Sequence, residues 1–333
     1  MRLFLTIAVY ALTALAHAQD PSAGFAGDAR TGAGQGYPAK PIRLVVPFSP
    51  GGPVDIVGRI VAQKLTNAFA QQVIVDNRAG GGGNIAIEIV ARSVPDGYTL
   101  LMGANGTNAI NPSLYPKLPV DPVKDLAPIG MVASSPMILV THPSVPANTV
   151  KELVMLAKNR PGAINFASSG SGSTAHLSAE LFKSMAGVNI VHVPYKGAGP
   201  ALTDLVGGQV QIMFTGISST LPYVKSNRLR PLAVSSEKRV PILPDLPTVS
   251  EDISGYEVLT WYGVFAPVKM AKPIVRKLNL TLAQIVATAD TRQRLAALGA
   301  VPVTMTPEQF GIAVDREIAK WAKVIKDAGV RPE

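Results

Sequence analysis

The 333-residue sequence contains no cysteine. This absence excludes disulfide bonds, thiol catalysis, cysteine–metal sites and a lipid-modified N-terminal cysteine. Histidine is also scarce, with four residues, and no His-Glu-x-x-His or similar metal-binding spacing occurs. The sequence therefore predicts no metal site built on cysteine or histidine.

Aromatic residues make up only 6% of the chain and charged residues only 16%. The formal net charge is +9, but Lys and Arg are scattered and form no basic run interleaved with aromatic side chains. With few stacking platforms and no basic stripe, nucleic acid is not an expected partner. We interpret the positive charge as favouring solubility and weak steering of anions.

Beyond the N-terminus, no apolar run is long enough to span a bilayer. The N-terminus has a basic start, an apolar stretch over residues 3–16 and the small-x-small sequence Ala16-His17-Ala18. This pattern predicts that residues 1–18 are a signal peptide cleaved after Ala18, and hence a soluble periplasmic protein. A membrane anchor is the alternative, but no polar stop-transfer flank follows. Residues 19–36, rich in Gly and Ala, are predicted to be a flexible leader.

Apolar residues are abundant, at 47%. From residue 37 onward, short β-branched runs alternate with helical patterns, which is typical of an α/β fold with mainly parallel sheets. The length favours two domains. We predict one lobe from residues 37–140 with 261–333, and a second from residues 141–260. Residues 104–136, rich in Asn, Pro and Ser, are predicted to be a long irregular connection.

Two loops place glycines between the end of a predicted strand and the start of a predicted helix. They are FSPGGP at residues 48–53 and SSGSGST at residues 168–174. Helix N-termini carry unpaired N–H groups and partial positive charge, and glycine lets a ligand approach the backbone closely. Such loops can hold a carboxylate or phosphate without Arg or Lys. Either loop alone could be an ordinary turn; two in separate lobes favour an anion held between the lobes.

Asp55 and His176 lie in the first turns of the helices that follow these loops. The helix dipole favours an acid at this position whatever the function. Asp55 is therefore either a helix-start carboxylate or a ligand contact. His176 could orient a serine or touch a ligand, although a packing role is commoner.

Sharper motifs are incomplete. A P-loop would need Lys and Ser/Thr directly after Gly52, where the sequence has Pro and Val. Residues 81–86 (GGGNIA) match a dinucleotide fingerprint, but the acidic residue expected about 20 positions later is missing. An exported serine hydrolase acting through Ser169 or Ser171 with His176 stays an alternative, although no G-x-S-x-G elbow is present.

A further set of sequence blocks runs from residue 37 towards the C-terminus. In order, they are Tyr37-Pro38 with IRLVVPF, PGGPVD at 50–55, DNRAGGGGNI at 76–85, PDGYTLLMG at 95–103, YPKLPVDPVKDLAPI at 115–129, NFASSGSGSTAHLSAELF at 165–182, HVPYKGAGPALTDLVGGQVQIMF at 192–214, LPDLPTVSE at 243–251 and WYGVFAP at 261–267. In this order and spacing, they resemble the Bug-type periplasmic receptors of tripartite tricarboxylate transporters.

The resemblance implies a two-lobed type II binding-protein fold, in which backbone groups of two loops and bridging water hold a ligand carboxylate. Those loops match positions 48–55 and 168–176 here. It also implies a receptor that performs no chemistry and needs no cofactor, with a small carboxylate and the membrane permease subunits as its partners. We further expect the protein to be a monomer. A ligand sensor for a signalling kinase would use the same site. Family members commonly have an acid where this chain has Thr215, so we expect the far end of the ligand to be neutral or acidic.

The residues predicted to contact the ligand are Phe48, Pro50, Gly51, Gly52, Asp55, Asn105, Ser168, Ser169, Gly172, Ser173, Thr174, His176 and Thr215.

Overall fold

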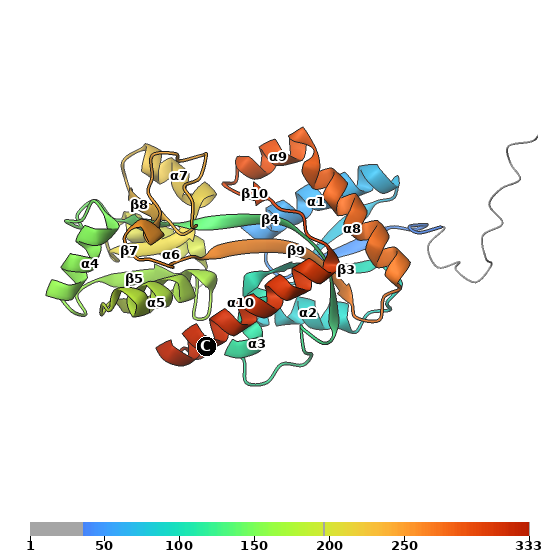
Figure 1. Ribbon diagram of the computed structural model, residues 1–333, viewed down its shortest axis with the longest axis horizontal. Helices are drawn as coiled ribbons and strands as arrows, with labels where there is room; N and C mark the ends of the chain where they lie inside the picture. Colours follow the sequence, from blue (N-terminus) through green and yellow to red (C-terminus); the bar gives the residue numbers. More distant parts are fainter. Residues whose placement is uncertain (1–35, 196, 333) are drawn as a thin grey trace, which may run out of the picture.

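The computed structural model describes residues 36–195 and 197–332. The predicted signal peptide, residues 1–18, and the predicted leader, residues 19–36 except for Gly36, lie outside the described residues. The predicted α/β fold with two lobes is confirmed. Figure 1 shows the lobes side by side, joined by two long strands.

Strands and helices alternate along most of the chain. The strands are β1 (Ile42–Val46), β2 (Val73–Asn77), β3 (Thr99–Ala104), β4 (Leu126–Thr141), β5 (Asn165–Ser168), β6 (Val191–Pro194), β7 (Ile212–Gly216), β8 (Arg230–Val234), β9 (Leu259–Pro267) and β10 (Val301–Pro302). The helices are α1 (Pro53–Phe69), α2 (Asn84–Ala91), α3 (Asn111–Leu114), α4 (Val150–Asn159), α5 (Thr174–Ala186), α6 (Ala198–Val206), α7 (Ile217–Lys225), α8 (Lys272–Ala287), α9 (Ala289–Ala296) and α10 (Pro307–Ala328), with single turns η1 (Gly81–Gly83), η2 (Gly106–Ile110) and η3 (Val249–Glu251).

Within the described residues, the strands pair in the order β2-β1-β3-β9-β4-β7-β5-β6, and β8 and β10 both pair with β4. Residues 126–136 of β4 pair with β9, whereas residues 137–141 pair with β7 and β8. We call the sheet of β1–β3, β9, β10 and the first part of β4 the first sheet. The second sheet consists of β5–β8 and the last part of β4. The lobe built on each sheet takes the same number.

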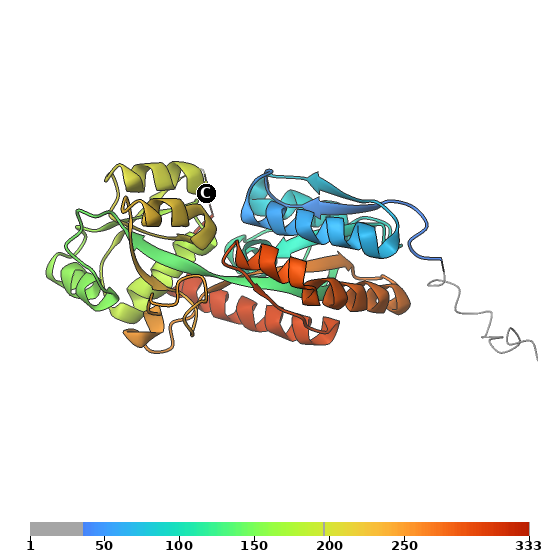
Figure 2. The ribbon, with the colours of Figure 1, turned by 90° about the horizontal axis from the view of Figure 1, so that it is seen from above.

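In each sheet, most strands run in one direction. In the first sheet, β1–β4 are parallel and β9 and β10 oppose them. In the second sheet, β5–β8 share one direction and β4 opposes them. Figure 2 shows β4, in green, running without a break from one lobe into the other. The residue ranges predicted for the lobes stay predictions, because β4 pairs with strands of both sheets and so belongs to both lobes.

A buried hydroxyl connects β4 to the segment before β9, just beyond the point where the pairing of the two strands ends. Ser235 is fully buried; its Oγ accepts the Met137 N–H at 2.7 Å and donates to the Val258 carbonyl at 2.5 Å. A buried polar side chain needs such partners. Ser235 therefore joins β4 to the segment that leads into β9.

Helix α10 packs across both lobes, against β4, η2 and α3 of the first lobe and against α5 of the second (Figure 1). It begins with Thr306 as N-cap, Pro307 in the first turn and a capping box to Gln309. Its buried side chains include Phe310 and Trp321, both with 0% exposure. The apolar stripe of α10 thus covers the crossing.

Residues 104–136 are not the irregular connection that composition predicts. They contain η2, α3 and most of β4. Prolines and Gly130 make this segment a poor strand by local preference. Pairing with β9 nevertheless holds it extended, and two register shifts, near Pro128 and after Met131, accommodate the misfit.

Candidate functional site

Both predicted loops lie at the carboxyl end of a strand that has parallel neighbours. The β1–α1 loop is residues 48–52 of the first lobe, and the β5–α5 loop is residues 168–173 of the second. Ligands of open α/β sheets bind outside the carboxyl ends of the strands. Each lobe therefore presents one of the two predicted loops at the edge where a ligand is expected.

Asp55 holds the β1–α1 loop in place. Its carboxylate is only 2% exposed and accepts the Gly51 N–H, Arg59 Nε and Asn77 Nδ2, each at 2.9 Å. Asn77 also donates to the Phe48 carbonyl at 2.9 Å. The loop is thus fastened to the start of α1 and to the end of β2, while Gly51 itself is exposed.

The Asp55 carboxyl is ionised at neutral pH. Burial on its own raises its pKa, but hydrogen bonds from Arg59, the Gly51 N–H and Asn77, with the charge of Arg59, hold the pKa below the ordinary range. The first turn of α1 therefore carries a buried negative charge that is paired with a guanidinium.

The β5–α5 loop is capped by Ser173 and His176. The Ser173 hydroxyl accepts the His176 N–H at 3.3 Å, and His176 Nδ1 accepts the Gly172 N–H at 3.0 Å. Together they form a variant of the capping box in which the third helical residue bonds the residue before the N-cap. Gly172 has φ +75°, so its backbone is in a region that favours glycine.

A second histidine supports this loop from β6. His192 Nε2 lies 2.6 Å from the Ser168 Oγ, and that hydroxyl also donates to the Gly170 carbonyl at 3.1 Å. The imidazole ring of His192 stacks on that of His176, with 3.7 Å between centroids and 8° between planes. Ser168 is fully buried, so its hydroxyl shapes the loop from within.

Burial, followed by the nearby His192 and Lys183, lowers the pKa of His176 from 6.5 to about 3. The ring is therefore neutral at pH 7. Because Nδ1 accepts a hydrogen bond, the proton lies on Nε2, which is 3.8 Å from Glu180 Oε1. Neither nitrogen is then available as a base for a neighbouring serine, which is what the hydrolase alternative needs.

The two lobes meet beside the β5–α5 loop. Thr174 Oγ1 lies 3.4 Å from Asn105 Oδ1, and Asn105 Nδ2 donates to the Leu259 carbonyl at 3.1 Å. A Cβ at Gly172 would overlap Leu114 Cδ2, so α3 of the first lobe packs directly against this glycine. Two predicted site residues, Asn105 and Thr174, are thus in contact across the lobes.

Gly172→Ala is expected to lower the free energy of unfolding by about 3 kcal/mol, through the contact with Leu114 and the positive φ. Gly187 also has positive φ, +61°, but a Cβ there would meet no atom within 4 Å. Gly187→Ala is therefore the matched control and should cost about 1 kcal/mol. Urea unfolding measures both. Equal losses in the two variants would contradict the contact.

The other predicted residues occupy the same edges of the sheets. Thr215 is 2% exposed near the end of strand β7, which neighbours β5. Ser169 is half-buried, Pro50 is exposed and Gly52 is the N-cap of α1. The hydrogen bonds of the described residues connect the β1–α1 loop to β2 rather than to the β5–α5 loop. Ligand contact by these residues stays a prediction.

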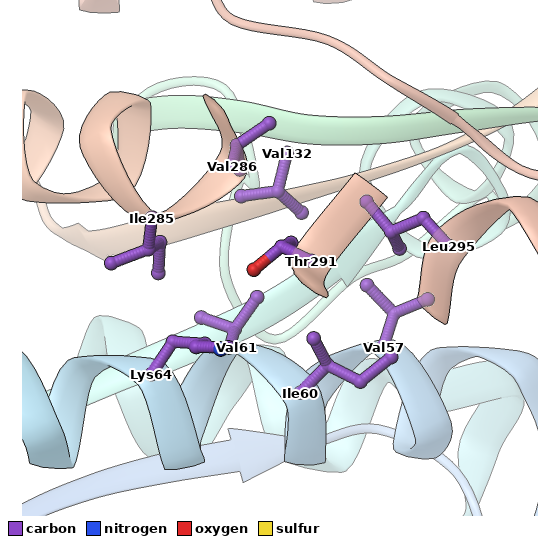
Figure 3. Close-up of a pocket in the computed structure, with 9 residues that line it drawn as sticks. All are labelled: Val57, Ile60, Val61, Lys64, Val132, Ile285, Val286, Thr291 and Leu295. Carbon is purple, nitrogen blue, oxygen red and sulfur yellow. The ribbon is translucent and has the colours of Figure 1, made fainter. Parts of the chain in front are cut away.

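Figure 3 shows a small apolar pocket elsewhere in the first lobe, between α1, α8 and α9. Its lining is Val57, Ile60, Val61, Lys64, Val132, Ile285, Val286, Thr291 and Leu295. The pocket contains no residue of either loop, and Lys64 is paired with Asp290 at 2.5 Å. We therefore interpret it as a gap in helix packing.

Over residues 36–195 and 197–332, no group of three or more His, Asp or Glu side chains is arranged to hold a metal ion. In the same residues, no helix combines the length and apolar character needed to cross a membrane.

The family model for the tripartite tricarboxylate transporter family receptor matches residues 57–330. The chain belongs to this receptor family. This chain is similar to the solved structure of R. palustris Rpa4515 with adipate, with 38% sequence identity and a TM-score of 0.82. The match covers 89% of this chain and 100% of Rpa4515.

Two further solved structures are similar to the receptor. Periplasmic binding protein BugD is 37% identical, with a TM-score of 0.78, covering 89% of this chain and 100% of BugD. MatC from Rhodopseudomonas palustris with bound malate is 32% identical, with a TM-score of 0.76, covering 87% of this chain and 100% of MatC. The resemblance to Bug-type receptors is thereby confirmed, and with it a solute-binding role.

Three residues that shape the receptor's loops are not among those predicted from the sequence. They are Asn77 at the end of β2, His192 on β6 and Leu114 on α3. Asn77 and His192 do lie on strands whose carboxyl ends face the same edge as the loops. Leu114 gives no signal in the sequence, because only the packing of the lobes brings it to Gly172.

Proposed function

We propose that this chain is a periplasmic receptor that captures a small carboxylate between the β1–α1 and β5–α5 loops. It then delivers the carboxylate to the permease subunits of a tripartite tricarboxylate transporter. The observation that carries the proposal is the pair of strand–glycine–helix loops, one at the carboxyl edge of each sheet. The related structures with adipate and malate support a carboxylate as the ligand.

Binding would rest on backbone groups. A helix N-terminus has unpaired N–H groups and partial positive charge, and both α1 and α5 begin at these loops. The β1–α1 loop, FSPGG, and the β5–α5 loop, SSGSGS, contain no charged side chain. A ligand that touches both loops favours the closed arrangement of the lobes, because it contacts both only there.

The remaining parts of the proposal concern where the receptor works and with what. The signal peptide would be removed after Ala18, and the mature chain would act as a soluble monomer in the periplasm. Its closed form would dock on the permease, and no chemical change of the ligand is required.

We expect thermal unfolding of the mature protein to respond to adipate, malate or another small acid. A ligand at about one hundred times its Kd adds about 2.7 kcal/mol to the free energy of unfolding, which raises the midpoint by several degrees. The matched control is the amide of the same acid, which should give no shift. Deleting the gene should then abolish uptake of that acid by cells.

The proposal fails if no acid moves the midpoint of protein that has been refolded to remove any co-purified ligand. Turnover of simple esters, lost on replacing Ser169, would favour the hydrolase instead. Binding of an acid without any loss of uptake on gene deletion would favour the sensor.

A further inference from the structure

The β1–α1 and β5–α5 loops are built on the same hydrogen bond. In the first, the Gly51 N–H donates to Asp55 Oδ2 at 2.9 Å; in the second, the Gly172 N–H donates to His176 Nδ1 at 3.0 Å. In each loop, the donor is the residue before the N-cap and the acceptor is the third residue of the helix. Both glycines have positive φ, +86° and +75°. Two unlike side chains thus make the same bond in the two lobes.

This bond acts at the residue of each loop whose backbone has the widest intrinsic freedom. Glycine at positive φ has the widest conformational freedom in the unfolded chain, and it directly precedes the helix start whose N–H groups are unpaired. A side chain anchored in the helix that accepts the glycine N–H fixes the loop relative to the helix. An ordered loop loses less conformational freedom when a ligand binds, so affinity is gained without direct contact.

Each acceptor is itself held in its accepting form. The Asp55 carboxylate accepts hydrogen bonds from Arg59 and Asn77 in addition to the one from Gly51. The His176 ring is stacked on His192, and its Nε2 faces Glu180 at 3.8 Å, so that Nδ1 is left unprotonated. Asp55 is 2% exposed and His176 is 6% exposed, so water competes little with either bond.

We propose that Asp55 and His176 are a matched pair of positioning residues, one in each lobe, that hold the two loops ready for the ligand. They act through Gly51 and Gly172, and need not touch the ligand. This inference rests on the proposed function, since it takes the two loops as the binding loops.

The chain supplies its own control. At the start of α4, the Asn148 N–H donates to Glu152 Oε2 at 2.7 Å, which is the same bond before the N-cap Thr149. This helix start follows the end of β4, which opposes the parallel strands of the second sheet. It therefore lies at the opposite edge from the β5–α5 loop. Breaking this bond removes an equivalent hydrogen bond away from the proposed site.

The test compares variants that lose the acceptor, Asp55→Leu and His176→Phe, with Asp55→Asn and His176→Asn, which keep a side-chain oxygen at the same position. Amide hydrogen exchange of Gly51 and Gly172 is followed by NMR in the empty protein, and adipate binding by calorimetry. We expect Asp55→Leu and His176→Phe to speed exchange of their own glycine and to weaken adipate binding about tenfold. The Asn variants should bind within about threefold of the parent, and Glu152→Leu should change neither readout.

Slow exchange at Gly51 and Gly172 in Asp55→Leu and His176→Phe, or parental adipate affinity in both, would overturn the pairing. The proposal would also be overturned if adipate binding were weakened equally in the Leu or Phe variant and in the Asn variant at the same position. A role in general stability predicts such equal weakening, because the side-chain oxygen of Asn would then restore nothing. If the parent binds neither adipate nor any other acid, the proposed function fails. The exchange measurement still decides whether the two side chains order the loops.

Discussion

Gly263→Ala is expected to lower the free energy of unfolding by about 3 kcal/mol or more. Gly263 lies in β9, and a Cβ there would overlap Phe310 Cζ and lie 3.1 Å from the Gly130 carbonyl oxygen. The Phe310 ring is fully buried and packs edge-on against Trp261 at 5.3 Å, so it has little room to move. Overpacking of this kind strains a close-packed core.

Urea unfolding measures the loss, and Gly216→Ala in β7 is the control. A Cβ at Gly216 would have Ser219 Oγ at 3.7 Å as its nearest neighbour, so this variant should change stability by less than about 1 kcal/mol. Adding Phe310→Leu to Gly263→Ala should recover part of the loss if the ring is the obstacle. A loss no larger than that of Gly216→Ala would show that α10 can withdraw from β9 at little cost.

Acidification from pH 7 to pH 4 is expected to remove up to about 3 kcal/mol of stability through His176 alone. Its pKa is about 3 in the folded protein and 6.5 ordinarily. Between these values, the unfolded chain binds a proton that the folded protein does not. Stability is therefore full above pH 6.5, falls as the pH drops through this window, and stops falling below about pH 3.

Other groups titrate in the same range, so the effect of His176 is measured as the difference in stability between the parent and a variant that lacks this histidine. Burial raises the pKa of Glu180, which adds stability on acidification and opposes His176. His176→Asn removes the histidine titration while leaving Glu180 and Lys183 in place. Urea unfolding of both proteins at pH 7, 6, 5 and 4 should give curves that converge as the pH falls. Parallel curves would mean that His176 takes up its proton without disturbing the fold.

Much of the fold follows from local patterns. The α/β alternation and the strand-to-helix position of both glycine loops are confirmed. Helix starts and glycine turns are set by a few adjacent residues, so a single sequence contains the information. The start of α4 is a further local case, in which the Thr149 hydroxyl accepts the Glu152 N–H at 3.1 Å and the Glu152 carboxylate accepts the Asn148 N–H at 2.7 Å.

What the sequence could not predict depends on residues far apart in the chain. The length of β4 comes from pairing with β9, which overrides the poor strand preference around Pro128 and Gly130. The role of Asp55 is open at the level of sequence because Asn77, 22 residues further on, is one of its donors. The stacking of His192 on His176 likewise needs β6 to lie beside β5. Ligand contact by the predicted site residues stays a prediction.

The position of β9 has a consequence for the order of folding. In the first sheet, β9 lies between β3 and β4, although it follows them in the sequence by more than a hundred residues. The second lobe can assemble largely from neighbouring segments, whereas the first lobe cannot close until β9 is available. Contacts between such distant segments form slowly. For a chain made with a signal peptide, as proposed here, this delay would help to keep the first lobe open until β9 has been synthesised.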